Sequence, residues 1–242
     1  MNIIQDQSYD FSYINNWIEK GMTHALIDLD NTLVEANITE LFFYLKRKTI
    51  HRYWNWILWC VYFAIVKAPI YLVLDYFNRE LFQRAFYRLY RSFSVEIIDN
   101  ASDHLFKKKC TSSLVEYTHH LIKYLQERDI QITLLSTNIE PIVKRFARKY
   151  NVSYACLPIV PKGAGSLVQL DSLRDFKLGH TNQYPSSSVL AVADSKHDLP
   201  ILNYADYSIV IADQPKLWMK RIHSNNMRFP RKILKITDSG IG

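Results

Sequence analysis

The sequence predicts an α/β protein whose core is a parallel β-sheet with helices on both faces. Short apolar segments of strand length alternate with longer segments of helical periodicity, which is typical of repeated strand–helix–strand units. The apolar segments also lack the polar alternation of half-exposed strands, and this indicates strands that are buried on both faces. The predicted strands are residues 24–30, 130–138, 154–160, 187–195 and 207–212.

The segments between these strands carry helix signals. Residues 112–129 have apolar side chains at helical spacing, and Ser112 or Ser113 is in position to cap that helix. The other predicted elements are a helix over residues 140–151, a short helix over residues 197–205, and a loop or small hairpin over residues 161–172.

The composition is that of a globular protein with a substantial core. Of 242 residues, 48% are hydrophobic and 22% are charged, enough for one large domain or for a core with an insertion. The 6 glycines form no phosphate-binding glycine loop. The 3 cysteines lack metal-ligand spacing, which favours a reducing compartment and no zinc site. The first residues lack the pattern of a secretory signal, so we expect none.

The chain is basic, with a formal net charge of +7. Much of this charge gathers in residues 46–52 and in the tail between Lys216 and Lys235. These side chains are either ordinary solvated surface or an attraction for an anionic partner such as lipid or substrate. Signatures of DNA-binding or RNA-binding motifs do not accompany the charge, so we expect no nucleic-acid partner.

Polar side chains end three of the predicted strands. In an open α/β sheet, ligands bind outside the carboxyl ends of the strands, so we expect these side chains to meet. They are Asp28 and Asp30 at the end of the first strand, Ser136 and Thr137 at the end of the second, and Asp194 at the end of the fourth.

Two carboxylates two residues apart project to the same side of an extended segment and repel each other. A hard divalent cation with oxygen ligands relieves that repulsion, and Mg²⁺ is the usual choice beside phosphate. Asp194 can supply a further ligand, and Asp198 can brace the site. One acid can then attack phosphorus while its neighbour moves protons, and Ser136 with a downstream lysine can hold the phosphoryl oxygens.

Three motifs, in this order, resemble those of the haloacid dehalogenase-like hydrolase superfamily. DLDNTL at residues 28–33 resembles its motif I, Asp-x-Asp-x-Thr, and ITLLSTN at residues 132–138 resembles motif II. AVADSKHDLPIL at residues 191–202 is similar to motif IV of the phosphoserine phosphatase-like branch. The resemblance implies a Rossmann-like catalytic core of residues 1–33 and 116–242, with a helical cap domain of residues 34–115 inserted after the first strand.

The resemblance implies roles for the acids. Asp28 is the implied nucleophile, and Asp30 is the implied general acid/base. An acid at position 30 favours phosphoester hydrolysis or phosphoryl transfer, because dehalogenases of the superfamily generally lack it and P-type ATPases carry threonine there. The implied Mg²⁺ ligands are Asp28, Asp30 through its backbone carbonyl, Asp194 and Asp198.

The resemblance also implies residues that bind phosphate or hold the loop. Asn31 departs from the family pattern, in which glycine is frequent, but asparagine also tolerates left-handed backbone angles. The implied residues are Thr32, Ser136 with Thr137 as the alternative, and the motif III lysine, for which we choose Lys177 over Lys162.

Residues 54–77 are apolar and aromatic around the whole circumference of a helix. Lys67 and Pro69 interrupt the segment, so we predict two shorter pieces in place of one long transmembrane helix. The segment is either a membrane contact, as a dipping hairpin or an interfacial anchor, or the buried core of the cap. Its position after a basic stretch resembles C-type phosphatidylglycerophosphate phosphatases, which implies a lipid-linked phosphate.

We therefore expect a Mg²⁺-dependent phosphomonoester hydrolase that acts through an aspartyl-phosphate on a small-molecule or lipid-linked phosphate. Two other functions stay open: a membrane-associated binding or scaffold protein with a degenerate site, and a phosphotransferase whose acceptor is not water. We expect the protein in the cytoplasm, free or held at the inner face of a membrane.

Overall fold

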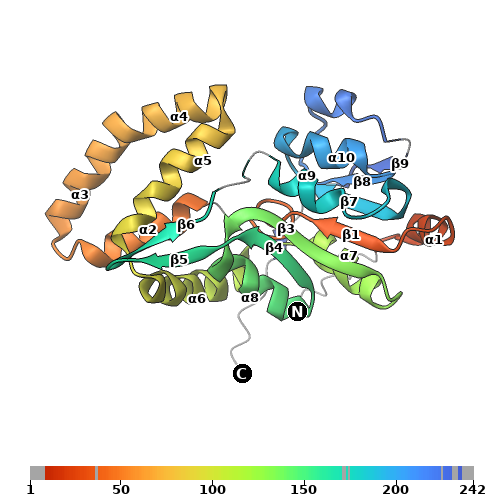
Figure 1. Cartoon of the computed structure of the whole chain (residues 1–242), viewed down its shortest axis with the longest axis horizontal. Coiled ribbons are helices and arrows are strands. Elements are labelled where there is room, and N and C mark those ends of the chain that lie inside the picture. The colour runs from red at the N-terminus through yellow and green to blue at the C-terminus, as the bar shows by residue number, and fades with distance from the viewer. Residues whose placement is uncertain are drawn as a thin grey trace, which may run out of the picture.

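The computed structural model of the chain describes residues 9–35, 38–170, 173, 175–224, 226–230 and 234–235, so parts of the basic tail lie outside it. The core is a six-stranded parallel sheet, which confirms the predicted α/β class (Figure 1). The strand order is β4–β3–β1–β7–β8–β9. The strands are β1 His24–Ile27, β3 Gln131–Ile139, β4 Ser153–Leu157, β7 Val189–Ala193, β8 Tyr207–Val210 and β9 Asn226–Arg228.

Strand β1 lies at the centre of the sheet, and its side chains alternate between two apolar cores. Ala25 and Ile27 belong to the core shared with α1, α7 and α8, whereas Leu26 belongs to the core shared with α10. Figure 1 shows α9 and α10 above the sheet and α7 and α8 below it. These helices are α1 Ser12–Glu19, α7 Glu116–Gln126, α8 Glu140–Tyr150, α9 Phe176–Thr181 and α10 Leu199–Tyr204.

The edge strand β9 was not among the five predicted strands. It is three residues long, and Met227 and Arg228 are exposed, so its sequence carries neither an apolar run nor an alternation. Its existence depends on parallel pairing with β8, which is a tertiary contact.

Helices fill most of the chain between β1 and the short strand β2 (Leu114–Val115). We call residues 38–112 the helical insertion. Aromatic side chains dominate its interior: Phe42 contacts Phe86, Tyr90 and Phe93, and all four are buried. The elements of the insertion are α2 Ile38–Thr49, α3 Tyr53–Tyr62, η1 Phe63–Lys67, α4 Ala68–Phe77, α5 Arg79–Tyr87, η2 Arg88–Ser92 and α6 Val95–Ser112.

Elements α3, η1 and α4 form one continuous helix of 25 residues, Tyr53–Phe77, so the predicted break at Lys67 and Pro69 does not interrupt the helix. The middle element η1 is a π-helical turn, in which the N–H of Ala68 donates to the carbonyl of Phe63. A π-turn shifts the hydrogen-bond ladder just before Pro69, and the helix continues past a residue that has no N–H to donate.

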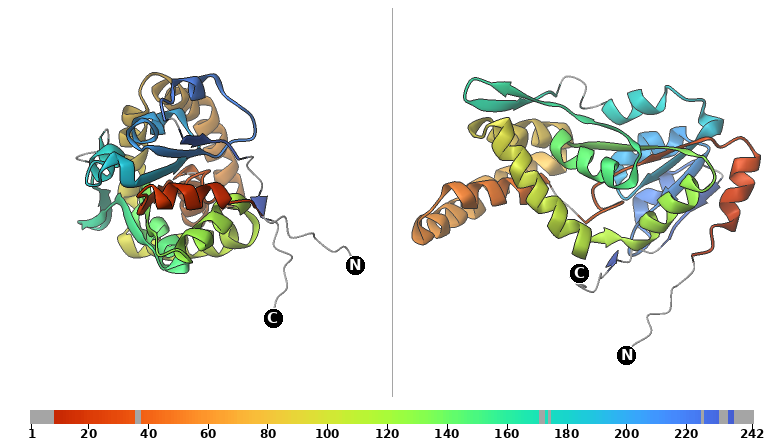
Figure 2. Two further views of the ribbon diagram at one scale, coloured as in Figure 1. Left: turned by 90° about the vertical axis from the view of Figure 1, so that its right-hand side faces the viewer. Right: turned by 90° about the horizontal axis from the view of Figure 1, so that it is seen from below.

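This long helix is also not the buried core of the insertion, as one of the two interpretations of the sequence had it. Only 6% of its most apolar window is buried, although the helix is long and apolar enough to cross a membrane. In the right-hand view of Figure 2, its α3 end projects away from the rest of the molecule.

The predicted cap of the helix after residue 112 is wrong. Helix α6 runs through Ser112, and Ser113 is followed by β2, which pairs with β10 (Leu234–Lys235). Helix α7 therefore begins only at Glu116, with Val115 as the preceding residue and no capping side chain. The pairing of β2 is a long-range contact that the local serine signal does not contain.

The predicted hairpin is present as β5 (Ile159–Lys162) and β6 (Gly165–Val168). Gly165 allows this hairpin to lie against the helical insertion, because a Cβ built on it would stand 2.0 Å from the carbonyl oxygen of Arg91. Nearby, the hydroxyl of Ser166 donates to the carbonyl of Tyr90 over 3.0 Å.

Replacing this glycine tests how tightly the hairpin packs. We expect Gly165→Ala to lower the free energy of unfolding by about 1–3 kcal/mol, because the added methyl overlaps backbone that cannot rotate away. Gly179→Ala is the matched control, since nothing lies within 4 Å of its Cβ position inside α9. Urea unfolding should show the control unchanged or stabilised, and equal stabilities for the two variants would contradict this packing.

Candidate active site

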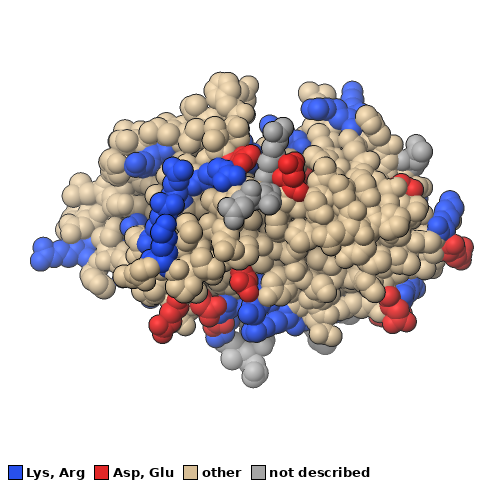
Figure 3. Space-filling model, in the orientation of Figure 1, with Lys and Arg blue, Asp and Glu red and all other residues tan. Residues whose placement is uncertain are grey.

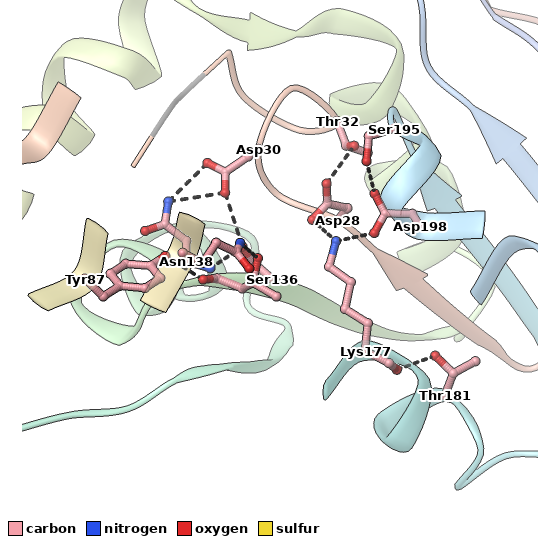
Figure 4. A network of polar contacts seen from close by, with 12 residues as sticks. Asp28, Asp30, Thr32, Tyr87, Ser136, Asn138, Lys177, Thr181, Ser195 and Asp198 are labelled. Carbon is pink, nitrogen blue, oxygen red and sulfur yellow. Dashed lines mark hydrogen bonds and ion pairs between the residues drawn. The ribbon is translucent and has the colours of Figure 1, made fainter. Parts of the chain in front are cut away.

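The polar residues at the carboxyl edge of the sheet meet in one place (Figure 4). Asp28 directly follows β1, and its N–H continues the sheet by donating to the carbonyl of Val192 over 2.9 Å. Asp194 directly follows β7, the neighbouring strand, and Ser136 lies in β3 on the other side. The convergence expected from the strand ends is therefore present.

The loop after β1 is held by its own side chains. Asn31 has a φ of +58°, the left-handed conformation that asparagine tolerates better than most residues. The hydroxyl of Thr32 donates to Oδ2 of Asp28 over 3.3 Å, and the hydroxyl of Thr118 donates to the carbonyl of Thr32 over 2.6 Å. Thr32 is fully buried, so its role is to position the loop.

Lys177 lies between two carboxylates. Its ammonium nitrogen is 2.7 Å from Oδ1 of Asp28 and 2.6 Å from Oδ1 of Asp198. Burial by itself lowers the pKa of Lys177, but the charges of Asp198 and Asp28 outweigh it and the pKa is raised, so the side chain is a cation. The alternative, Lys162, is exposed on the β5–β6 hairpin. It does not line the cavity into which Asp28 and Lys177 face, which is described below.

Three acids form a cluster around this ammonium group. Ligand atoms of Asp28, Asp194 and Asp198 all lie within 4.8 Å of one another, and Ser195 donates to Oδ2 of Asp198 over 2.7 Å. Burial raises the pKa of Asp28; Lys177 opposes the rise, and the two neighbouring acids add to it. Burial and the charge of Asp198 also raise the pKa of Asp194, to about 6. Oxygen ligands at this spacing suit a hard divalent cation.

The Asp30 carboxylate faces away from this cluster. The side-chain amide of Asn138 donates to both of its oxygens, over 3.1 and 3.3 Å, and the hydroxyl of Ser136 donates to Oδ2 over 3.4 Å. Burial raises the pKa of Asp30 to about 6, although the hydrogen bond from Asn138 lowers it. A carboxyl with a pKa near neutrality can both give and take a proton at physiological pH.

Ser136 and Thr137 have different surroundings. Ser136 is fully buried, and its hydroxyl also accepts a hydrogen bond from the N–H of Asn138 over 3.0 Å. Thr137, the alternative for motif II, lines the central cavity. It is fixed from the helical insertion: Gln83 donates to its hydroxyl over 2.9 Å, and the Tyr87 hydroxyl donates to its carbonyl over 2.6 Å.

A cavity of about 590 Å³ lies between the sheet edge and the helical insertion. Its polar floor contains the catalytic candidates, and its other wall comes from the end of α4 and the start of α5. From the core it is lined by Asp28, Asp30, Asn31, Thr137, Leu173, Lys177, Asp194, Ser195, His197 and Asp198, and from the insertion by Phe77, Asn78, Arg79, Glu80 and Gln83.

Several residues that line the cavity or hold its polar groups were not among the predicted site residues. Asn138 directly follows the motif II hydroxyls and Ser195 directly follows Asp194, so both lie within the quoted motifs although neither was given a role. Arg79, Gln83 and Tyr87 carry no such local signal, because only the folding of the insertion brings them to the sheet edge.

The chain belongs to the haloacid dehalogenase-like hydrolase family, whose model matches residues 25–203. It is therefore an enzyme of this hydrolase class. A search of curated proteins by sequence finds no match.

Solved structures with this fold include several phosphatases. A phospho-aspartyl intermediate analogue of phosphoserine phosphatase is 17% identical, with a TM-score of 0.58, covering 86% of this chain and 93% of its own. A Bordetella pertussis Tohama I protein of unknown function is 13% identical, with a TM-score of 0.65, covering 86% and 98%. Cytosolic 5′-nucleotidase IIIB bound to cytidine is 12% identical, with a TM-score of 0.59, covering 91% and 85%.

Removing the positive charge at Lys177 should destabilise the fold. We expect Lys177→Gln to lower the free energy of unfolding by about 3 kcal/mol without divalent cation, since buried acids lose their compensating charge. Millimolar Mg²⁺ should recover part of that loss. The control is Lys196→Gln, an exposed lysine close by in the chain. If both variants unfold at the same urea concentration as the parent, Lys177 does not compensate the acids.

Proposed function

We propose that this protein is a Mg²⁺-dependent phosphomonoester hydrolase that acts through an aspartyl-phosphate on Asp28. The observation that carries the proposal is that two acids of one loop have different surroundings. Asp28 lies against Lys177 and the acid cluster, whereas Asp30 lies apart from them and is held by Asn138. A nucleophile and a proton carrier need these two different environments.

In the first step, a carboxylate oxygen of Asp28 attacks phosphorus and the bond from phosphorus to the leaving oxygen breaks. Asp30 gives its proton to that oxygen, so the alcohol leaves neutral. In the second step, Asp30 takes a proton from water, whose oxygen attacks the phosphorus of the aspartyl-phosphate. The bond between phosphorus and Asp28 breaks, and inorganic phosphate leaves with the nucleophile regenerated.

The other predicted site residues position the nucleophile, the proton carrier or the phosphate. Lys177 places a positive charge 2.7 Å from Oδ1 of Asp28, where the phosphoryl oxygens arrive. Thr32 orients the nucleophile, and Ser136 holds Asp30, while the cavity-facing Thr137 offers the hydroxyl for phosphate. Asp28, Asp194, Asp198 and the backbone carbonyl of Asp30 would hold Mg²⁺, which would supply positive charge to neutralise the acids and the phosphate.

The helical insertion acts as a cap domain in this proposal. It forms one wall of the cavity and bonds to Thr137 through Gln83 and Tyr87, so it can select the leaving group while the core performs the chemistry. The substrate is a small-molecule or lipid-linked phosphate, and the protein works in the cytoplasm or at the inner face of a membrane. The phosphotransferase alternative differs from the proposal in its product, since the phosphoryl group goes to an acceptor other than water. The scaffold alternative differs in having no turnover.

The test is turnover of an aryl phosphate with Mg²⁺. We expect Asp28→Asn to lose activity on the order of a thousandfold or more, because an amide is a poor nucleophile for phosphorus. Asp206→Asn, an exposed acid outside the cavity lining, should retain activity. Chelation by EDTA should stop turnover and added Mg²⁺ should restore it. A parent protein inactive on a broad phosphate panel would favour the scaffold, and transfer to added alcohol would favour the phosphotransferase.

A further inference from the structure

The helix Tyr53–Phe77 presents an apolar surface to solvent on the side that faces away from the insertion. From Trp54 to Tyr76 its most exposed large side chains follow one another at intervals of four or seven residues, and Phe77 comes directly after Tyr76 at the end of the helix; each is 67% to 79% accessible. A stripe of this size on a soluble protein marks an interaction site. We call this stripe the docking face; its members are Trp54, Leu58, Ile65, Leu72, Tyr76 and Phe77.

The opposite side of the same helix is fastened to the insertion. Phe63 is buried and its ring lies 4.9 Å from that of Phe43 in α2, while the Tyr71 ring lies 5.7 Å from that of Phe86 in α5. The helix therefore has one packed side and one free side, although its sequence is apolar all round.

The connections at the two ends prevent this helix from crossing a bilayer. Three residues join α2 to α3, and only Asn78 joins α4 to α5, so these links reach roughly 10 Å and 4 Å at most. Crossing about 30 Å of hydrocarbon would place α2 and α5 on opposite sides. These helices pack together, with the rings of Phe42 and Phe86 5.5 Å apart and both side chains buried.

Basic side chains flank the docking face. Arg84, Arg88 and Arg91 line one shallow cavity of about 290 Å³ beside the β5–β6 hairpin. Figure 3 shows a band of basic side chains across the insertion, beside the largely uncharged surface over α3 and α4. At the start of the helix, the Arg47 guanidinium lies 5.9 Å from the ring of Trp56. Along the helix itself, the Asp75 carboxylate is paired with Arg79 at 2.6 Å.

From these observations we propose that the docking face lies in the surface of an anionic lipid bilayer, with the helix parallel to the membrane plane. Apolar side chains enter the acyl boundary, arginines meet the lipid phosphates, and aromatic residues at both ends sit at head-group level. A protein partner would explain the apolar stripe but not the adjacent positive band, which matches a negatively charged surface.

This placement also indicates the substrate class, and that part of the inference rests on the proposed function. Phe77 ends the docking face and lines the catalytic cavity, together with Asn78 and Arg79. A helix lying in the membrane surface therefore brings the cavity mouth to the level of the head groups. The substrate is a phosphomonoester carried on a lipid, which enters past Phe77 while its acyl chains stay in the bilayer.

Sedimentation with vesicles tests the docking face. We expect the unmodified protein to bind vesicles of phosphatidylcholine and phosphatidylglycerol, and Ile65→Glu to weaken binding at least about tenfold by placing a charge in the apolar boundary. Leu217→Glu is the matched control, because Leu217 is an exposed apolar residue outside the helical insertion. Leu72→Glu repeats the test in case the first variant misfolds. Arg88→Gln with Arg91→Gln should weaken binding roughly tenfold and reduce its dependence on salt.

The parallel orientation has its own readout. The variants Arg52→Cys and Leu81→Cys, at positions that flank the helix, should both react with an impermeant maleimide from outside the vesicle. Both are made in a chain in which Cys60, Cys110 and Cys156 are replaced by serine. Reaction at one position alone would show a spanning helix and overturn the proposal. A lipid-free dimer that Ile65→Glu dissociates, together with no vesicle binding, would instead assign the docking face to a second copy of this chain.

Activity separates the two proposals. Asp28→Asn should bind vesicles like the parent, and Ile65→Glu should keep full activity on a soluble aryl phosphate while losing it on phosphatidate in vesicles. A parent that binds vesicles but hydrolyses neither substrate would refute the proposed function and leave the docking face standing. Equal loss on both substrates in Ile65→Glu would refute the lipid substrate class.

Discussion

The site depends on one ammonium group placed between two buried carboxylates. Lys177 reaches from α9 to Asp28 at the end of β1 and to Asp198 beyond β7, so a single side chain joins three elements of the sheet edge. Without it, Asp28, Asp194 and Asp198 would bring three acids together in a largely water-excluded space. Burial first, and the neighbouring acids second, raise the pKa of Asp28 and of Asp194. Oxygen ligands at this spacing suit a hard divalent cation.

The helical insertion connects this chemistry to its surroundings. One side of it holds the motif II strand through Gln83 and Tyr87, and the end of α4 and start of α5 form a wall of the cavity at the sheet edge. Its aromatic interior fixes α2 and α5 against each other, and that packing keeps the long helix Tyr53–Phe77 on the surface of the protein. The helical insertion thus forms one wall of the cavity and presents an apolar face that ends at Phe77 in the same wall.

The site residues that directly follow a predicted strand were predictable from the sequence. Asp28, Asp30 and Asp194 follow apolar runs, and the rule that ligands bind at the carboxyl ends of parallel strands brings them together. Lys177 required a choice between two lysines, because the path of the chain between β6 and β7 decides which one reaches the acids. Asn138 was missed although it is the last residue of the motif II segment, since an amide that holds a carboxylate looks like an ordinary strand-end residue.

The fold differed from prediction where long-range contacts override local signals. The π-turn before Pro69 keeps a helix intact that proline would otherwise interrupt, and the pairing of β2 with β10 displaces the start of α7 from Ser113. Strand β9 forms only because β8 offers an edge for it. The exposure of the helix Tyr53–Phe77 was not readable either, because an apolar sequence fits a buried core and a membrane-facing surface equally well.

The most direct measurement of the central claim is the mass of the peptide that contains Asp28, taken from an Asp30→Asn variant quenched in acid during turnover. Loss of the proton carrier should slow hydrolysis of the intermediate, so the account predicts that this peptide gains the mass of one phosphoryl group, and that the gain disappears when Asp28 is also replaced by Asn. Turnover without any covalent phosphate, or phosphate found on a different residue, would contradict it.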